Sequence, residues 1–451
     1  MILLPAFLRI AVFLAFGAGV VLYFHLITDP GTPKLINLHP QAPESNNTSS
    51  NDAFNFPPLD SEAIRSICAD TQWNPALVFT CSESVGGIGN IRNSILNCVR
   101  FAISAGATLV EPTIVLRNDA DSAEIRTGVK TDIGYIAEIR TGVKTDIGYM
   151  FDPAHFRESL RLSCPGMKVY DRIEDLKGVA FHDPIALLPE SLEEKVPSTG
   201  LPHPEKWRES FEAWLGQHVG PLPKGTVTIN LQRSYLTYPI YSDGENFALA
   251  FGKLLKFRTD TRILATKTLL AIATNASYSA DLSQPILPDF FFGAHLRTEH
   301  DAQLGWPAQD WLYSRYETQA KFYFKQALAL GLERVYIASG DQEEVVKFAH
   351  EAAEKNITVL TKFDVLGAED AAQLEALTWD QQGMVDFLVM LRASQFAGVG
   401  HSSFAWNIAL VRHVFAQQRD HLRGPQLLND ELSEILGYPK QYPEYANCLW
   451  P

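Results

Sequence analysis

Three polar clusters follow predicted strands in the second half of the chain, at 295–297 (His-Leu-Arg), 339–341 (Ser-Gly-Asp) and 400–403 (Gly-His-Ser-Ser). In an open parallel sheet, ligands bind beyond the edge where the strands end. We therefore expect the three clusters to converge on one ligand site. The predicted members of that site are His295, Arg297, Gly340, Asp341, His401, Ser402 and Ser403.

Arg297 is the residue best suited to bind a ligand that carries phosphate. A guanidinium keeps its charge and can hold a diphosphate through two parallel hydrogen bonds. The alternative role for Arg297 is a salt bridge to Asp301 or Asp341. His295, on the same face of the strand, is either a second site residue or a core histidine that bonds a backbone carbonyl.

Ser402 and Ser403 stand at the start of a predicted helix over 403–415. Free backbone N–H groups and the positive end of the helix dipole favour a phosphate there, although Ser403 could equally be an N-cap and nothing more. Asp386 lies on a predicted helix over 381–393. Its carboxylate either reaches a nucleotide base or belongs to a solvated face.

A glycine-rich turn at 86–92 (Gly-Gly-Ile-Gly-Asn-Ile-Arg) separates a predicted strand from a predicted helix in the first half. The turn nearly matches a dinucleotide-binding fingerprint, and Glu111 falls where the ribose-binding acid would sit. Arg92 replaces the third glycine, and its long side chain would prevent close helix–strand packing. An oxidoreductase is therefore disfavoured, and Arg92 is expected to point into a cleft.

Composition excludes other classes of function. The 451 residues include 38 Lys and Arg against 52 Asp and Glu, which gives a net charge of −14. An acidic chain lacks the electrostatic attraction on which nucleic-acid binding depends. No Cys/His cluster has metal-ligand spacing, and no Gly-x-Ser-x-Gly elbow is present. We expect no nucleic-acid partner, no metal and no bound cofactor.

The N-terminal segment indicates the compartment. Residues 10–24 carry no polar side chain, and 3–27 is long enough to span a bilayer if Arg9 reaches the interface. We interpret 1–28 as a signal anchor rather than a cleaved signal peptide, followed by a disordered stem at 29–58. Either interpretation places the folded portion in the lumen of the Golgi or endoplasmic reticulum, and the anchor makes it a single-pass membrane protein. Glycosylation sequons, weak support for this location, begin at Asn46, Asn47, Asn275 and Asn356.

Strands that alternate with helices predict two α/β halves with parallel sheets. We place these halves at 59–255 and 286–451, joined by a helical connection at 256–285, with the ligand site in the cleft between them. Residues 137–149 repeat 123–135 without a change. Two copies do not make a solenoid, so we place the duplication in a loop without a function. Some of the five cysteines are expected to pair in an oxidising lumen, and at least one stays free.

These same segments resemble the GDP-fucose O-fucosyltransferase-like family, particularly its plant-type branch. That branch carries Gly-Gly-Leu-Asn-Gln-Met-Arg where this chain has 86–92, and His-Leu-Arg before an acidic stretch where this chain has 295–301. Its Tyr-Ile-Ala-Ser-Gly-Glu is similar to 336–341. Its later Asp, followed by a strand that ends in small polar residues, is similar to 386–403.

The resemblance implies a GT-B fold, in which the C-terminal Rossmann-like domain holds the nucleotide-sugar donor and the N-terminal one lies on the acceptor side. It implies that Arg297 binds the donor diphosphate and assists the leaving group. It also implies that Gly86, Gly87, Asn90 and Arg92 face the donor across the cleft. Gly89 and Asn90 depart from the Asn-Gln pair of the plant-type motif, which affects the expected contacts of the first domain.

The resulting expectation is a lumenal glycosyltransferase that moves fucose from GDP-fucose to a hydroxyl of a protein or glycan acceptor, with inversion and without a metal. A fixed guanidinium can stabilise the departing GDP. The nearby candidates for the acceptor base are His295, Glu299 and Asp301. Two alternatives stay open: a transferase for another nucleotide sugar such as rhamnose, and a non-catalytic lumenal binding protein that kept the fold.

Overall fold

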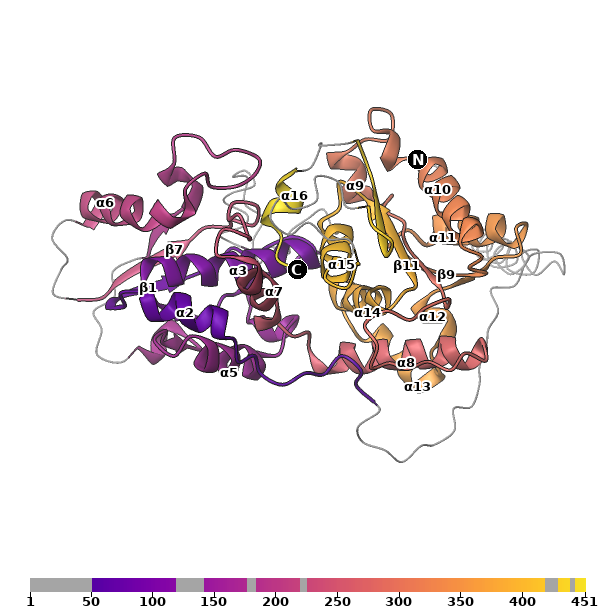
Figure 1. The fold of residues 1–451 in the computed structure, drawn as a ribbon, viewed down its shortest axis with the longest axis horizontal. Helices are drawn as coiled ribbons and strands as arrows, with labels where there is room; N and C mark the ends of the chain where they lie inside the picture. Colours follow the sequence, from indigo (N-terminus) through magenta and orange to yellow (C-terminus); the bar gives the residue numbers. More distant parts are fainter. Residues whose placement is uncertain (1–50, 119–141, 177–183, 220–224, 418–428, 439–442) are drawn as a thin grey trace, which may run out of the picture.

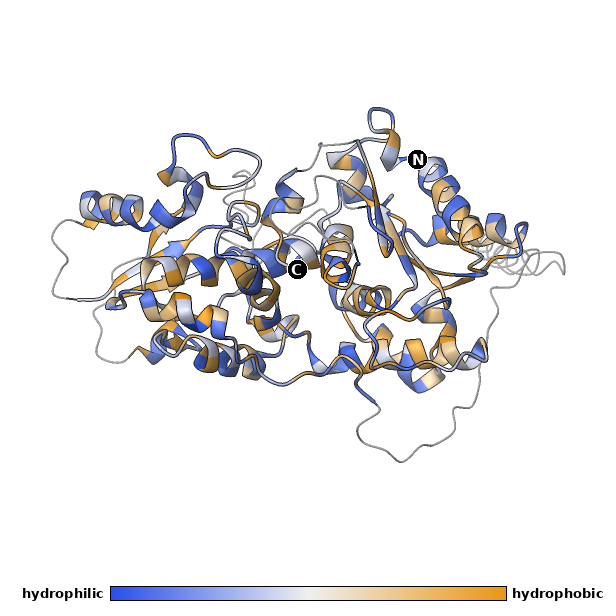
Figure 2. Cartoon of the chain, viewed as in Figure 1, coloured by the Kyte–Doolittle hydropathy of each residue, from blue (hydrophilic) through white to orange (hydrophobic). Residues whose placement is uncertain are grey.

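The computed structural model describes residues 51–118, 142–176, 184–219, 225–417, 429–438 and 443–451, and these form two halves with one five-stranded sheet each (Figure 1). All strand pairs within the two sheets are parallel. Apolar residues concentrate along the strands and on one side of the helices that cover them (Figure 2). The prediction of an α/β protein with parallel sheets is confirmed.

The first sheet has the strand order β5-β2-β1-β7-β6. Its central strand is buried through Leu77, Val78 and Phe79, as expected of a parallel sheet that has helices on both faces. A separate antiparallel pair joins β3 to β4 beside it. The elements of this half are α2 (Glu62–Asp70), β1 (Asn74–Thr80), α3 (Ile88–Ala105), β2 (Ala107–Val110), β3 (Ile114–Val115), β4 (Lys144–Thr145), η1 (Ile147–Tyr149), α5 (Pro153–Ser163), β5 (Val169–Tyr170), η2 (Ile173–Asp175), β6 (Ile185–Leu187), η3 (Pro189–Leu192), η4 (Pro204–Lys206), α6 (Trp207–Val219) and β7 (Val227–Leu231).

The second sheet has the order β10-β9-β8-β11-β12. The strands predicted at 334–338 and 395–399 have those bounds, whereas the helix predicted over 308–330 begins only at Tyr316. The elements of this half are β8 (Phe292–His295), α9 (His300–Gly305), η6 (Leu312–Ser314), α10 (Tyr316–Ala329), β9 (Arg334–Ala338), α11 (Gln342–Ala353), β10 (Thr358–Leu360), α12 (Lys362–Val365), α13 (Ala368–Glu375), α14 (Trp379–Leu391), β11 (Gln395–Val399), α15 (Ser403–His413) and β12 (Ser433–Leu436).

Two segments tie the halves together. Between the sheets run α7 (Glu245–Phe251), η5 (Gly252–Leu254) and α8 (Thr259–Asn275), and α8 packs on α14 of the second half. The last residues, which the sequence assigned to the second half, return to the first: Trp450, after α16 (Pro443–Cys448), lies 4.6 Å from Phe251, ring centroid to ring centroid. The C-terminus accordingly lies between the halves in Figure 1.

Arg92 belongs to this C-terminal contact and does not point into the cleft. Its guanidinium is buried and donates hydrogen bonds to the carbonyl oxygens of Trp450 and Pro451, at 2.5 and 2.8 Å. It also donates to the carbonyl of Gly252 and to Oδ1 of Asn407. Burial lowers the pKa of Arg92 to about 10, so the guanidinium stays charged at neutral pH. The prediction that Arg92 points into the cleft was wrong; the residue joins α3 to residues 450 and 451.

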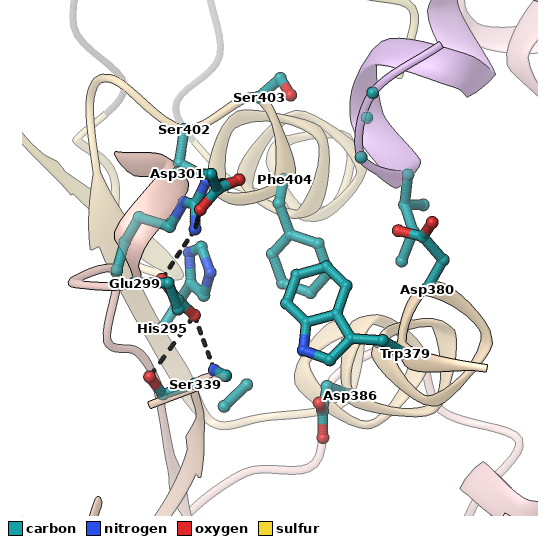
Figure 3. Close-up of a pocket in the computed structure, with 18 of the residues that line it drawn as sticks. His295, Glu299, Asp301, Ser339, Trp379, Asp380, Asp386, Ser402, Ser403 and Phe404 are labelled. Atoms are coloured by element: carbon teal, nitrogen blue, oxygen red, sulfur yellow. Dashed lines mark hydrogen bonds and ion pairs between the residues drawn. The ribbon is translucent and has the colours of Figure 1, made fainter. Parts of the chain in front are cut away.

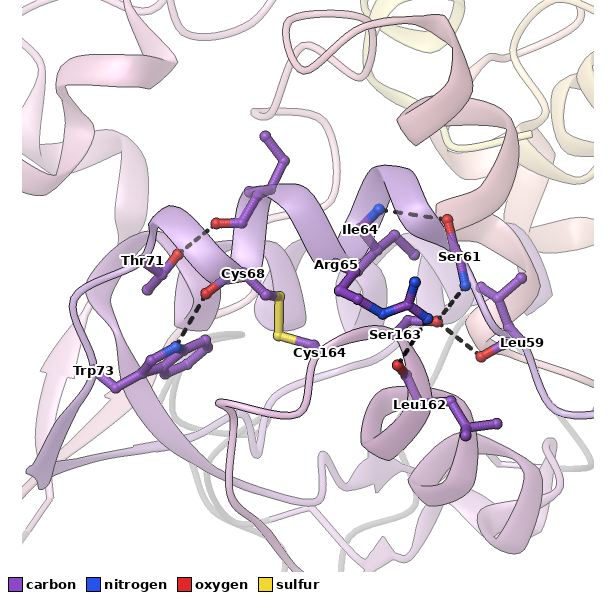
Figure 4. Close-up of a disulfide and its surroundings, with 11 residues drawn as sticks. Leu59, Ser61, Ile64, Arg65, Cys68, Thr71, Trp73, Leu162, Ser163 and Cys164 are labelled. Atoms are coloured by element: carbon purple, nitrogen blue, oxygen red, sulfur yellow. Dashed lines mark hydrogen bonds between the residues drawn. A yellow bond between two sulfur atoms is a disulfide. The ribbon is translucent and has the colours of Figure 1, made fainter.

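Two disulfides brace the first half. Cys68 on α2 pairs with Cys164 at the end of α5 (Figure 4). Cys81, just after β1, pairs with Cys98 on α3, and this bond spans the glycine-rich turn. Cys448 is buried and unpaired. Sequence alone left the pairing open because it depends on which helices come together.

Two segments that we expected to be unstructured are folded where the structure describes them. Residues 51–58 of the predicted stem pack on the connection between the halves: Asp52 pairs with Arg262 of α8 at 2.9 Å, and Phe54 is buried. The end of the second repeat copy forms β4 and η1, in which Ile147 is fully buried. The rest of that duplication lies outside the described residues.

Among the described residues, no helix combines the length and apolar character that a membrane span requires. The anchor predicted at 1–28 falls outside them.

Candidate functional site

A cavity of about 820 Å³ opens between the two halves (Figure 3). The glycine-rich turn at 86–90 lines it from the first half. The ends of β8, β9 and β11 and the first turns of α14 and α15 line it from the second half. Every predicted site residue lines this cavity except Arg92 and Asp341.

Arg297 lies just beyond β8, and hydrogen bonds hold both its backbone and its guanidinium in place. Its backbone N–H donates to Oε1 of Gln319 on α10, and its carbonyl accepts from Nε2 of the same side chain. The guanidinium donates to both carboxylate oxygens of Asp301, at 2.7 and 2.8 Å, and to Glu299 at 2.7 Å. The salt bridge that we weighed as an alternative is therefore present, yet the side chain still borders the cavity and is 18% exposed.

Arg297 keeps its positive charge in this site. Burial acts to lower the pKa of Arg297, but the negative charges of Glu299 and Asp301 outweigh it and raise that pKa above its ordinary value. Burial favours the neutral form of both carboxyl groups, and the guanidinium reverses this, so both carboxyl pKa values lie below their ordinary range. The cluster is ionised at neutral pH, with one cation between two anions.

Glu299 orients the loop after β9 as well as Arg297. Its Oε1 accepts from the backbone N–H of Gly340 at 2.6 Å and lies 3.4 Å from the hydroxyl of Ser339 (Figure 3). Both oxygens of Glu299 are therefore occupied, which makes it a positioning residue rather than a free base. Asp341 takes no part: its side chain caps α11 by accepting from the N–H of Glu344, so the prediction that Asp341 lines the site was wrong.

Two buried histidines line the cavity in their neutral form. Burial lowers the pKa of His295 to about 4 and that of His401 to about 3. Nδ1 of His295 and Nε2 of His401 are buried without a hydrogen-bond partner among the described residues. His295 packs against Phe404, with ring centroids 4.6 Å apart, and its ring does not bond a backbone carbonyl as a core histidine would. A buried polar atom without a partner is costly, and a ligand would provide one.

Two helix N-termini meet at the cavity. Ser402, not Ser403, is the N-cap of α15, since its hydroxyl accepts from the N–H of Ala405. The N-cap of α3 is Gly87, which has no side chain to occupy the free N–H groups. Gly89 allows the N-termini of α3 and α15 to approach each other closely, because a Cβ at this position would lie 2.7 Å from the carbonyl of Ser403. Paired helix N-termini favour an anion through their free N–H groups and dipoles.

Asp386 does not lie on a solvated face, which was one of the two roles that the sequence suggested. It is buried at the cavity wall, where it pairs with Lys362 and accepts a hydrogen bond from the hydroxyl of Tyr336 at 2.7 Å. The pair places one ammonium group at the wall of the cavity.

Sequence reasoning missed Arg117 and the start of α14. Arg117 reaches the cavity from the first half, pairs with Asp380, and its guanidinium lies over the ring of Trp379, 5.0 Å from the ring centroid. No local sequence pattern indicated these residues, because Arg117 follows a two-residue strand and its ion-pair partner Asp380 lies 263 positions away. A capping box at Thr378 was the only sequence signal for the start of α14.

A second hollow, of about 540 Å³, lies beyond the ends of the first sheet's strands. Its polar walls include Ser82 and Asn230, whose side chains are hydrogen-bonded at 3.0 Å, and Lys144, which donates to Ser82 at 3.2 Å. Within the described residues, neither this hollow nor the larger cavity holds three or more His, Cys, Asp or Glu side chains arranged to bind a metal.

The family model described as GDP-fucose protein O-fucosyltransferase matches residues 77–415. Among solved structures, POFUT1 in complex with GDP is 12% identical, with 81% of this chain and 100% of that chain covered and a TM-score of 0.43. Fucosyltransferase NodZ from Bradyrhizobium is 15% identical, with 75% and 92% covered and a TM-score of 0.37. Arabidopsis thaliana FUT1, as a mutant in complex with GDP, is 9% identical, with 78% and 72% covered and a TM-score of 0.37. No curated protein matches the chain significantly.

Proposed function

For this chain, which belongs to the GDP-fucose protein O-fucosyltransferase family, we propose that it transfers fucose from GDP-fucose to a hydroxyl of a protein or glycan acceptor. Membership of the family makes it a glycosyltransferase. The site-level proposal is that the cavity between the halves binds the nucleotide sugar, with a GT-B arrangement of donor and acceptor sides.

The observation that carries the proposal is the position of Arg297. It lies at the carboxyl end of a parallel strand, borders the cavity between the halves, and stays charged. The N-termini of α3 and α15 open onto the same cavity. A fixed guanidinium and two helix N-termini form an environment suited to a diphosphate.

The reaction places charge where this arrangement can stabilise it. The bond between C1 of fucose and the β-phosphate oxygen breaks, and C1 forms a new bond to the acceptor oxygen with inversion. Negative charge grows on the departing GDP, and Arg297 stabilises it without a metal ion. The acceptor's proton must leave to a base, and Asp301 becomes available once the diphosphate takes its place on Arg297.

The neutral histidines are suited to contacts with the bound donor. Since the pKa values of His295 and His401 lie near 4 and 3, both rings are uncharged at neutral pH and neither repels nor attracts the diphosphate by charge. Each has one buried nitrogen without a partner, and we propose that these nitrogens hydrogen-bond the nucleotide sugar.

We also propose a lumenal location in the Golgi or endoplasmic reticulum, behind an anchor formed by 1–28. Two disulfides support it, because such bonds persist in oxidising compartments. The sequon residues Asn275 and Asn356 are exposed, where an oligosaccharide can be added. A mass shift on glycosidase digestion of protein expressed in eukaryotic cells would support this; unmodified protein with reduced cysteines would count against it.

Calorimetric titration of the purified chain with GDP, GDP-fucose and a UDP-sugar tests the donor. The proposal predicts binding of GDP and GDP-fucose and none of the UDP-sugar. If the chain binds GDP linked to another sugar more tightly than GDP-fucose, the proposed donor sugar changes from fucose to that sugar. Absence of any nucleotide binding would refute the transferase function and favour a non-catalytic binding protein.

A further inference from the structure

Arg117 brings a second guanidinium into the cavity, from the opposite half of the molecule. It follows β3, and its side chain is 10% exposed. The guanidinium contacts three residues of the second half: it pairs with Asp380, its Nη1 lies 3.6 Å from Oδ2 of Asp301, and it lies over the ring of Trp379. The side chain thus crosses the cavity between the halves.

The segment that carries Arg117 is fixed against the glycine-rich turn. The backbone N–H of Val115 donates to the carbonyl of Ser84 at 2.8 Å, and that of Leu116 donates to the carbonyl of Val143 at 2.9 Å. A Cβ built on Gly87 would lie 3.8 Å from Nη2 of Arg117. The guanidinium therefore lies beside the N-terminus of α3, in the region where we place the diphosphate.

Asp301 is shared by the two arginines. Arg297 donates to both of its oxygens, and Arg117 approaches one of the same oxygens, Oδ2. Two guanidinium groups from opposite halves thus converge on one carboxylate. A diphosphate carries anionic oxygens on two linked phosphoryl groups, so it can replace this carboxylate and engage both cations at once.

We propose that Arg117 is a second donor-binding residue, which contacts the diphosphate together with Arg297 when the nucleotide displaces Asp301. This inference rests on the proposed function and deepens it. Each half then supplies one guanidinium to the leaving group, so the bound diphosphate bridges the halves. The site should discriminate strongly for a nucleoside diphosphate against a monophosphate, because a single phosphoryl group cannot reach both arginines equally well.

The competing role for Arg117 is a latch that joins the halves through Asp380 and never touches the nucleotide. The two roles differ in what Asp380 does. For a donor contact, Asp380 competes with the diphosphate for Arg117, so neutralising it leaves GDP affinity unchanged or higher. For a latch, Asp380→Asn removes the same bridge as Arg117→Ala and causes the same loss.

The test is calorimetric titration of the full chain with GDP, GMP and guanosine. Arg117→Ala should weaken GDP binding by about 10- to 100-fold, the range for loss of a charge-assisted hydrogen bond, and leave guanosine binding unchanged. Arg117→Lys should lose less, since it keeps the charge but not the planar fork. Arg208→Ala is the control, because Arg208 lies on α6, pairs with Glu212 and does not line the cavity.

The outcomes separate the claims. Unchanged GDP affinity in Arg117→Ala, equal losses for GDP and guanosine, or a matching loss in Asp380→Asn would each overturn the assignment of Arg117. Each would leave the proposed function standing, provided that Arg297→Ala abolishes GDP binding. If the native chain binds no GDP, the proposed function itself fails. Thermal melting of each variant identifies any loss that comes from unfolding.

Discussion

Adding one methyl group at Gly89 should damage both the fold and donor binding. A Cβ there would lie 2.7 Å from the carbonyl carbon and oxygen of Ser403 and 2.8 Å from its hydroxyl. Carbon atoms pack best at about 3.5–4.0 Å, and the obstructing atoms are mostly backbone. The N-termini of α3 and α15 would therefore have to separate by on the order of 1 Å.

The magnitude follows from two opposing effects. Overpacking costs about 1–3 kcal/mol, whereas Gly→Ala within a helix contributes about 0.5–1 kcal/mol of stability. We expect Gly89→Ala to destabilise the protein on balance by about 1–2 kcal/mol. Because the displaced helix ends border the cavity, GDP affinity should fall as well.

Gly216 supplies the matched control. It lies inside α6, where an added Cβ would meet nothing within 4 Å, so Gly216→Ala should raise stability and leave GDP binding alone. Urea unfolding measures the first quantity and calorimetry the second. The reasoning fails if Gly89→Ala is as stable as Gly216→Ala and binds GDP as tightly as the native chain.

Three further predictions concern charge, protonation and cross-links. Arg297→Ala should abolish turnover, and Arg297→Lys should not restore it, since an ammonium lacks the planar fork; a transfer assay in which the lysine variant runs at a near-native rate would show the fork to be unimportant. The depressed pKa values of His295 and His401, about 4 and about 3, mean that the unfolded chain binds more protons than the folded one below about pH 6.5. Their contribution to stability is therefore complete above that pH and is lost as pH falls toward 4, so His401→Gln should flatten the decline in melting temperature between pH 6.5 and 4; an unaltered slope would contradict it. Removing the Cys81–Cys98 disulfide, which closes a loop of 17 residues, should lower the free energy of unfolding by about 3 kcal/mol. It should also lower GDP affinity more than removing the Cys68–Cys164 disulfide does. Double Cys→Ser variants of each disulfide test both statements.

The sequence predicted those elements whose local pattern and tertiary packing agree. The strands at 334–338 and 395–399 are apolar runs bounded by polar clusters, and the structure has them at those positions. The helix predicted over 308–330 was too long at its start. Residues 308–315 form a loop that contains the short 3-10 helix η6, and Arg315 donates there to the carbonyl of Ala308, a bond that helical periodicity does not reveal.

The cavity residues likewise include some that the sequence could predict and some that it could not. Arg297, His295 and Ser402 could be found because strand ends in a parallel sheet share one edge. Arg117 could not, since its place depends on how one half docks on the other. Arg92 was misassigned because its partners, the carbonyls of residues 450 and 451, come from a chain end whose return to the first half no sequence pattern indicated.

The most direct test of the donor site is a crystal structure of the chain with GDP. The account predicts that the diphosphate lies between the glycine-rich turn and the end of β8, with phosphoryl oxygens at hydrogen-bond distance from the guanidinium of Arg297 and from the N-terminus of α15. GDP bound elsewhere, or bound in the cavity with Arg297 still paired to Asp301, would contradict it.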